Sequence, residues 1–120
     1  MEGASLSAES RGDTMVITIS GDLDIVTSPQ LDECLTRVEG DHDAIILDFG
    51  GVTFLDTSAL AVIVGHWKHA EAKGGTLALA SARYRYTKTL WITGLADKLT
   101  LYDTVDAGLA ALAQAGPADR

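Results

Sequence analysis

Hydrophobic and polar positions along the chain follow two spacings, which predict strands and helices in turn. Residues 14–20 alternate as in a strand with one buried face, and Met15, Ile17 and Ile19 share that face. The segment Gly21-Asp22-Leu23-Asp24 is expected to end this strand. Residues 44–49 form an almost unbroken apolar run, which indicates a strand covered on both faces and followed by Gly50-Gly51. Residues 76–80 and 99–102 predict two further strands.

Four segments predict helices. The first begins at Ser28-Pro29, with Thr27 or Ser28 as its cap, and ends at Gly40. The second runs from Asp56-Thr57-Ser58 to Lys73-Gly74-Gly75. Residues 83–93 predict a weaker helix that stops at Gly94-Leu95, and a final alanine-rich helix runs from a cap at Asp103 or Thr104 to about Ala113. The apolar stripes of the first two helices are Leu31, Cys34, Leu35 and Val38, and Leu60, Ile63, Val64 and Trp67.

The order of these elements indicates an α/β fold. Strands that alternate with helices of this length predict an open sheet, mostly parallel at its centre, with helices packed on it. We expect a single domain over residues 1–120, with an ordered core at about 12–114 and a C-terminal tail at 116–120. The polar N-terminal segment predicts either a frayed end or a short edge strand. Trp67 and Trp91 are expected in the core.

Composition narrows the classes of function. The chain has 120 residues, a net charge of −8 and no apolar run long enough to cross a bilayer. The acidic charge argues against direct binding of nucleic acid or of an anionic membrane. The N-terminus has no secretory signal, so we expect a cytoplasmic protein. Cys34 is the only cysteine and is expected to be buried and inert, and the basic stretch from Arg83 to Lys88 is interpreted as a solvated helix face.

Candidate chemistry lies in two loops that follow predicted strands, at 21–27 and 54–61, where open α/β sheets place functional groups. In the second loop, Asp56 is predicted to cap a helix, and Ser58 is expected in the first turn with its hydroxyl near solvent. A phosphate on Ser58 would meet the positive end of the helix dipole and unpaired backbone donors. Local chemistry alone, however, favours an ordinary helix cap.

An enzymatic interpretation has little support. Asp22, Asp24 and Asp56 are candidates for acid–base chemistry, but no nucleophile has an evident base, and a Walker-type phosphate loop is absent from the sequence. His66 and His69 lie three residues apart without a clear third ligand, so we expect exposed or half-buried helix positions for them and no metal site. The chain is therefore expected to be no enzyme and to need no cofactor.

Three segments resemble the STAS domains of bacterial anti-sigma-factor antagonists, and their order and spacing match from about residue 14 to residue 112. The segments are Gly21-Asp22-Leu23-Asp24, Val52 to Ile63, and Thr93-Gly94-Leu95. The resemblance implies a four- to five-stranded mixed sheet with about four helices, mainly on one side. It also implies that Ser58 corresponds to the family's phosphorylated serine, Asp56 to the aspartate before it, and Asp24 to the aspartate of its Gly-Glu-Leu-Asp turn.

The resemblance implies partner switching. In this family, an unphosphorylated antagonist binds an anti-sigma factor and frees a sigma factor for transcription. The anti-sigma factor is also a GHKL-type, ATP-dependent serine kinase that inactivates the antagonist, and a metal-dependent serine phosphatase restores it. We expect this chain to act in the same way, with Ser58 rather than Thr57 as phosphoacceptor. The residues expected to contact the partner are Asp22, Asp24, Thr27, Asp56, Thr57, Ser58, Ala59, Ala61 and Val62.

The sequence also departs from the family pattern. Ala59 and Ala61 stand where the family usually has glycine, and Asp22 stands where it commonly has glutamate. Alanine favours a helix over glycine by about 1 kcal/mol, so the fold is not threatened. The resemblance implies, however, that the added methyl groups lie where a kinase partner is expected to approach. The resemblance also leaves an alternative, because STAS-like domains serve in other assemblies: a non-phosphorylated STAS-type binding module, such as a subunit of a lipid-transport or scaffold assembly.

Overall fold

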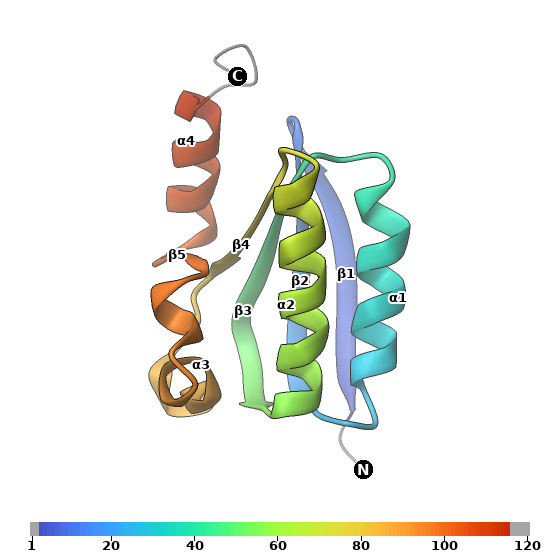
Figure 1. Ribbon diagram of the computed structural model, residues 1–120, viewed down its shortest axis with the longest axis vertical. Coiled ribbons are helices and arrows are strands. Elements are labelled where there is room, and N and C mark those ends of the chain that lie inside the picture. The colour runs from blue at the N-terminus through green and yellow to red at the C-terminus, as the bar shows by residue number, and fades with distance from the viewer. Residues whose placement is uncertain (1–2, 116–120) are drawn as a thin grey trace.

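The computed structural model describes residues 3–115, which form a five-stranded mixed sheet with helices on both faces (Figure 1). The strands lie in the order β1-β2-β3-β4-β5; β1 pairs antiparallel with β2, and all other pairs are parallel. Their bounds are Ala4–Arg11 for β1, Thr14–Leu23 for β2, Ala44–Leu55 for β3, Thr76–Ala80 for β4 and Thr100–Tyr102 for β5. The expected mixed α/β sheet is confirmed.

The helices lie mainly on one side of the sheet, as expected. Helices α1 (Ser28–Glu39) and α2 (Thr57–Ala72) cover one face, and α4 (Val105–Ala115) packs on the other (Figure 1). Helix α3 (Lys88–Ile92), between the 3-10 turns η1 (Tyr84–Tyr86) and η2 (Leu95–Asp97), lies at the end of the molecule where α2 begins. Among residues 3–115, no helix combines the length and the apolar character that a bilayer span requires.

Two apolar clusters lie on opposite faces of the sheet. The larger one joins inward residues of β2, β3 and β4 to the stripes of α1 and α2, and Ile17, Leu47 and Ile63 are fully buried in it. The smaller one places Ile46 of β3 under α4. Strand β3 therefore contributes to both clusters, as its unbroken apolar run predicts. Cys34 is buried on the α1 stripe, and this burial raises the pKa of its thiol, which keeps the thiol in its less reactive form.

Strands β2 and β3 are longer than the hydrophobic pattern predicts. β2 continues through Gly21 to Leu23, and β3 continues through Gly50-Gly51 to Leu55, so the expected ends at residues 20 and 49 are wrong. The pairing of the two strands shifts register on either side of Gly21. Gly21 has a φ of +93°, and a Cβ there would collide with the carbonyl oxygen of Gly3. A bulge built on glycine thus extends both strands toward the helix starts.

The helix expected over 83–93 is interrupted at Thr87, which corrects that prediction. Thr87 has a φ of −135° and a ψ of 36°, and its hydroxyl donates a hydrogen bond to the carbonyl of Arg83 at 2.6 Å. Such a side-chain bond competes with helical backbone bonding, so residues 84–86 form a 3-10 turn. Gly94 confirms the expected stop, since its φ of +81° is the left-handed conformation that glycine adopts at helix ends.

The two ends of the described chain resolve the remaining alternatives. The N-terminal segment forms the edge strand β1, so the ordered core begins before residue 12. The last helix is capped by Thr104, whose Oγ1 accepts a hydrogen bond from the N–H of Ala107 at 3.0 Å. The expected tail at 116–120 lies outside the described residues.

His66 connects α2 to α1. Its Nε2 lies 2.6 Å from Oδ1 of Asp32, and its Nδ1 lies 2.9 Å from Oε2 of Glu39. Burial lowers the pKa of His66, but the hydrogen bonds to Asp32 and Glu39 outweigh it and raise the pKa. Both contacts are hydrogen bonds only when both ring nitrogens carry protons. We call this contact the His66 bridge; the exposed His69 lies at its margin, with Nε2 at 3.8 Å from Glu39 Oε1.

We expect the His66 bridge to stabilise the fold more at mildly acidic than at alkaline pH. A group whose pKa rises on folding contributes fully below its unfolded pKa, about 6.5 for histidine, and loses the contribution as pH rises through the folded pKa. Replacement His66→Gln should lower the free energy of unfolding by about 1 kcal/mol below that window, and by less above it. Urea unfolding across the pH range measures this, with His69→Gln as the matched control. Parallel pH profiles for wild type and His66→Gln would contradict the bridge.

Candidate functional site

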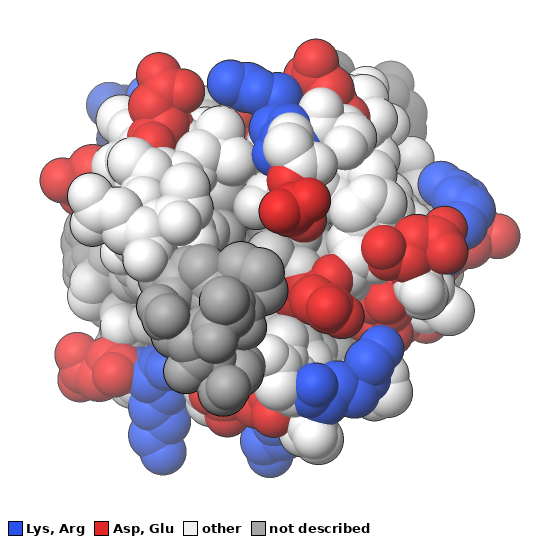
Figure 2. Space-filling view, turned by 90° about the horizontal axis from the view of Figure 1, so that it is seen from above, with Lys and Arg blue, Asp and Glu red and all other residues white. Residues whose placement is uncertain are grey.

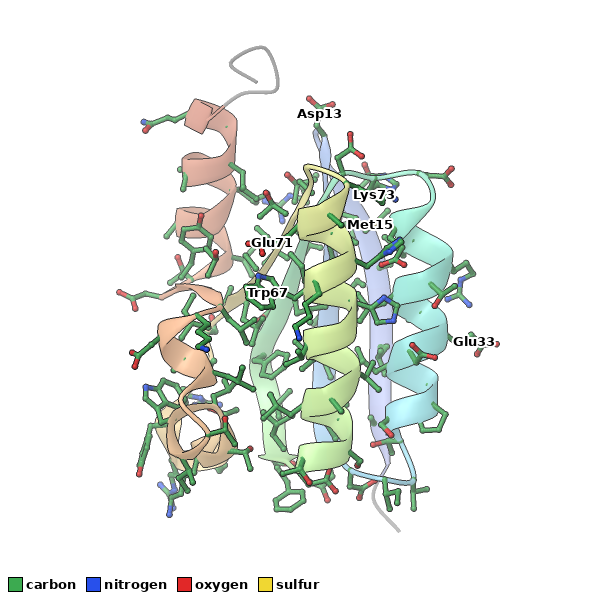
Figure 3. All side chains as sticks on the ribbon, in the orientation of Figure 1. Asp13, Met15, Glu33, Trp67, Glu71 and Lys73 are labelled. Carbon is green, nitrogen blue, oxygen red and sulfur yellow. The ribbon has the colours of Figure 1, made fainter. Side chains whose placement is uncertain are left out.

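The two candidate loops meet at the carboxyl ends of β2 and β3. The β2–α1 loop follows Leu23, and α2 begins directly after β3 at Asp56. The backbone N–H of Asp56 donates to the carbonyl of Leu23 at 3.0 Å, which joins the two strand ends. The site therefore lies at the start of α2, and Lys73 in Figure 3 marks the opposite end of that helix.

Asp56 caps α2 with its side chain, as the sequence predicts. It has an extended backbone, and its Oδ1 accepts hydrogen bonds from the N–H of Ser58 at 2.9 Å and of Ala59 at 3.2 Å. The same oxygen accepts a bond from the Ser58 hydroxyl at 2.6 Å. The first N–H groups of a helix have no partner within it, so one carboxylate oxygen satisfies two of them and orients a hydroxyl.

Ser58 is the second residue of α2 and is half-buried. It lies neither inside a strand nor deep in the core. One expectation about it is wrong, however: the N–H groups of Ser58 and Ala59 are not unpaired, because Asp56 occupies both. The N–H of Leu60 also donates to the Asp56 carbonyl, at 3.1 Å. An anion on Ser58 would therefore meet the carboxylate of Asp56 before it met free amides.

The charge state of Asp56 follows from these contacts. Partial burial alone would raise the pKa of its carboxyl, but the hydrogen bonds from the Ser58 hydroxyl and from the N–H groups of Ala59 and Ser58 outweigh burial and lower the pKa. Donors that favour the charged form act in this direction. At neutral pH, Asp56 is therefore a carboxylate in direct contact with the Ser58 hydroxyl.

A hydrogen-bond network holds the β2–α1 loop in shape. The Thr27 hydroxyl donates to the carbonyl of Asp22 at 2.8 Å and accepts a bond from the N–H of Asp24 at 2.9 Å. Oδ1 of Asp24 accepts from the N–H groups of Val26 and Thr27 at 3.0 and 3.1 Å. Oδ1 of Asp22 accepts from the hydroxyl of Thr53 at 2.7 Å and so ties the loop to β3. Thr27 is the cap residue of α1, but its side chain bonds the loop rather than the helix.

The structure brings most of the predicted contact residues to this end of the molecule. Thr57 and Ala61 are exposed, and the half-buried ones are Asp22, Asp24, Asp56, Ser58 and Val62. Thr27 and Ala59 are only 6% and 0% exposed. In the free domain, the Thr27 side chain braces the loop and the Ala59 side chain packs in the core, so partner contact at these two positions stays a prediction.

Sequence reasoning missed a set of exposed apolar side chains beside these residues. Ile25 and Val26, both 74% exposed, directly follow Asp24, and Phe54, 49% exposed, comes two residues before Asp56. Neighbouring exposed hydrophobic side chains mark interaction surfaces. The signal was the apolar pair Ile25-Val26 inside an otherwise polar turn. We call the surface formed by Ile25, Val26, Phe54, Thr57 and Ser58 the Ser58 surface.

A hollow lies at the opposite end of the sheet from the Ser58 surface. It has a volume of about 1100 Å³ and is lined by the loops before β2, β3 and β4 and by α4, with Asp13, Asp41 and Asp43 among its residues. Figure 2 shows this end, where acidic side chains lie near the centre of the view. Within residues 3–115, however, no group of three or more His, Cys, Asp or Glu side chains is placed to hold a metal ion. The built hydrogen-bond network therefore favours the Ser58 end as the functional site.

Fold and site together define a class of protein: a small α/β domain that presents a helix-start serine, held by an aspartate, within a partly apolar surface suited to another protein. The sequence matches the family model of the STAS domain over residues 5–108. The chain belongs to the STAS domain family.

Named relatives and solved structures share this similarity. The anti-sigma F factor antagonist of Paenibacillus polymyxa is 32% identical over 93 residues, which cover 74% of this chain and 78% of that protein. The crystal structure of an anti-sigma factor antagonist from Mycobacterium paratuberculosis has a TM-score of 0.82 and 25% identity, and the alignment covers 90% of this chain and 92% of that one. The phosphorylated form of the Bacillus cell fate determinant SpoIIAA shares the fold, with a TM-score of 0.72 and 22% identity over 90% of this chain and 99% of that one.

We expect the Asp56 cap to stabilise the domain only while its carboxyl is ionised. A group whose pKa falls on folding contributes above its unfolded pKa, about 3.9 for aspartate, and loses the contribution as pH drops through the folded pKa. Replacement Asp56→Ala should lower the free energy of unfolding by about 1 kcal/mol at neutral pH. The difference from wild type should shrink in acid.

Asp56→Asn is the matched control, because asparagine caps helices about as well as aspartate but does not titrate. Urea unfolding at a series of pH values gives the free energy of unfolding of wild type, Asp56→Ala and Asp56→Asn. A constant difference between wild type and Asp56→Ala from neutral to acidic pH would contradict an ionised cap.

Proposed function

We propose that this protein is an anti-sigma factor antagonist that binds an anti-sigma factor with serine kinase activity through the Ser58 surface, and that phosphorylation of Ser58 ends the binding. The names of its relatives support the class of function. The observation that carries the proposal is the half-buried Ser58 hydroxyl, which donates to Asp56 at the start of α2. In this proposal a metal-dependent serine phosphatase reverses the modification, and the protein acts in the cytoplasm.

The geometry suits Ser58 to accept a phosphoryl group. Asp56 fixes the hydroxyl by the 2.6 Å bond and so orients the oxygen lone pairs that would attack the γ-phosphorus of ATP. In that step a bond forms between Oγ and the phosphorus, the bond to the leaving ADP breaks, and the hydroxyl proton leaves toward a base. Thr57 is more exposed, but it has no such bond to Asp56 within the described residues.

A phosphate on Ser58 would add about −1.5 to −2 charges at neutral pH. The ester oxygen no longer donates a proton to Asp56, so an attractive contact becomes a repulsive one. Because Asp56 also occupies the nearest amides, the phosphate would turn outward, toward a docked partner. Asp22 and Asp24 in the adjoining loop make this end of the molecule still more negative.

The repulsion that a phosphate on Ser58 would add is large enough to release a bound partner. Repulsion between the phosphate and one acidic side chain of a partner at 4 Å is about 1 kcal/mol per unit charge in water and about 4 kcal/mol at an effective dielectric of 20. Moving a complex from 99% to 1% bound takes about 5.5 kcal/mol. Two charges at the centre of an interface, together with their desolvation and bulk, reach this value. No large change of fold is required.

Exposed apolar side chains would supply the binding energy that the phosphate opposes. Ile25 and Val26, in the loop before α1, are 74% exposed in the free domain, and Phe54, just before the start of α2, is 49% exposed. Burial of such side chains at the centre of an interface drives most protein association. A charge introduced among them would remain poorly solvated in the complex, which adds to the repulsion.

A second candidate is a STAS-type binding module that is not phosphorylated. Its support is Ala61, whose methyl group stands on the exposed face of α2 where the family usually has glycine. Ala59 gives it no support, because its side chain is fully buried and cannot obstruct a kinase. The two candidates differ in one measurable property, the modification of Ser58.

Phosphorylation should occur on Ser58 and should abolish binding. Incubation with ATP and the GHKL-type serine kinase encoded nearest to this protein should add one phosphate, which mass spectrometry locates at Ser58. Ser58→Ala should bind that kinase with wild-type affinity and stay unmodified. Ser58→Glu should bind at least about a hundredfold more weakly in calorimetry, since about 2.8 kcal/mol of repulsion gives that factor.

Thr57→Ala is the control for the neighbouring hydroxyl and should be phosphorylated like wild type. A kinase that modifies its own established substrate but adds no phosphate anywhere from Asp56 to Leu60 would favour the second candidate. Unimpaired binding of the phosphorylated protein would contradict the switch.

A further inference from the structure

A second exposed surface lies on η1 and α3. Tyr84, Trp91 and Ile92 are 54%, 38% and 75% exposed, so the expected core position of Trp91 is wrong. The rings of Tyr84 and Trp91 pack edge to face, with centroids 5.4 Å apart. Three exposed cations belong to the same segment. We call this surface the α3 ledge, formed by Arg83, Tyr84, Arg85, Lys88, Trp91 and Ile92.

The ledge is basic in an acidic protein. The whole chain has 17 acidic and 9 basic residues, and three of the basic ones fall within residues 83–88. Arg83 and Arg85 lie 5.1 and 5.5 Å from the ring centroid of Tyr86, and Arg83 also donates to the carbonyl of Gly50 at 2.7 Å. In the part of the chain that the structure describes, no carboxylate lies within 4.0 Å of these arginines or of Lys88. The Tyr86 ring therefore restrains the guanidinium groups of Arg83 and Arg85 without neutralising their charge.

The ledge adjoins the Ser58 surface. The hydroxyl of Thr89 donates to the carbonyl of Leu55 at 2.7 Å, and Leu55 directly precedes Asp56. Helix α3 also contacts α2, and Figure 1 shows it at the end of the molecule where α2 begins. The two exposed surfaces are thus held together by a hydrogen bond between buried backbone and α3, and a partner of ordinary interface size would cover both.

We propose that the α3 ledge is the second half of the docking surface and binds an acidic segment, with an exposed apolar side chain, on the same anti-sigma partner that covers Ser58. This inference rests on the proposed function. The cations of the ledge favour acidic side chains, and the exposed rings and Ile92 offer the apolar contacts that dominate interfaces.

The arrangement also determines orientation. Asp22 and Asp24 lie at the end of β2 and in the loop before α1, and Arg85 and Lys88 lie on η1 and α3, on the other side of the start of α2 (Figure 1). The docking surface is therefore acidic on one side and basic on the other. A partner of complementary pattern fits in one orientation, because the reversed orientation brings like charges together. A single-stranded nucleic acid would also meet cations and aromatic faces here. The net charge of −8 opposes it.

Two variants test the ledge against the kinase used above, with affinity measured by calorimetry at low and at high salt. Arg85→Glu/Lys88→Glu should weaken binding by about tenfold at low salt and by less at high salt, because screening acts on exposed charges. Ile92→Ser should weaken binding by about tenfold at both salt concentrations, because it removes an apolar contact. Ile92 is 75% exposed in the free protein, so this change leaves the fold intact.

Lys68→Glu/Lys73→Glu is the matched control, with the same change of net charge on α2 and its C-terminal cap; it should bind like wild type. Wild-type affinity of both ledge variants, together with weak binding of Ser58→Glu, would overturn the ledge and leave the proposed function standing. Wild-type affinity of both ledge variants and of Ser58→Glu would overturn the ledge and the proposed function together. Binding of a single-stranded oligonucleotide by the free protein, lost in Arg85→Glu/Lys88→Glu, would also overturn the assignment to an acidic protein segment.

Discussion

The site depends on one carboxylate oxygen, Oδ1 of Asp56, which accepts hydrogen bonds from two backbone amides and from the Ser58 hydroxyl. The amide bonds determine where α2 begins. The backbone of the same residue donates to Leu23 and so holds the end of β2 against the end of β3. A single residue therefore links strand, strand, helix and hydroxyl, and the position of Ser58 follows from it.

The same oxygen explains why a modification here would have a large effect without unfolding the domain. In the free protein, the Ser58 hydroxyl stabilises the Asp56 carboxylate by donating a hydrogen bond to it. After phosphorylation this donor would be lost, and two anions would be adjacent. If the helix keeps its amide bonds to Asp56, the repulsion would be relieved by turning the phosphate away from the protein. A partner that covers this surface would occupy the space into which the phosphate turns.

The positions of the elements could be predicted where short-range patterns determine them. Residues 76–80, the α1 stripe and the Asp56 cap depend on side chains within one or two turns, and all three predictions hold. The extension of β2 past Gly21 could not be predicted, because it depends on a register shift against a strand about 30 residues away. The break at Thr87 likewise depends on a choice between two local hydrogen bonds that only tertiary packing decides.

The same division holds for the site. Asp56 and Ser58 are neighbours in sequence, so their contact follows from helix-capping chemistry alone. Thr27 and Ala59 were expected to contact the partner, but both are buried in the free domain, and burial depends on the direction in which the loop and helix face the core. The His66 bridge joins residues 27 and 34 positions apart and has no counterpart in a local pattern. The His66 bridge holds α1 against α2, and α1 directly follows the β2–α1 loop that carries Ile25 and Val26. The Ser58 surface is therefore supported by contacts that lie outside it. In the proposed function, a surface fixed in this way would dock a partner without rearrangement, and a local change of charge would be enough to release that partner.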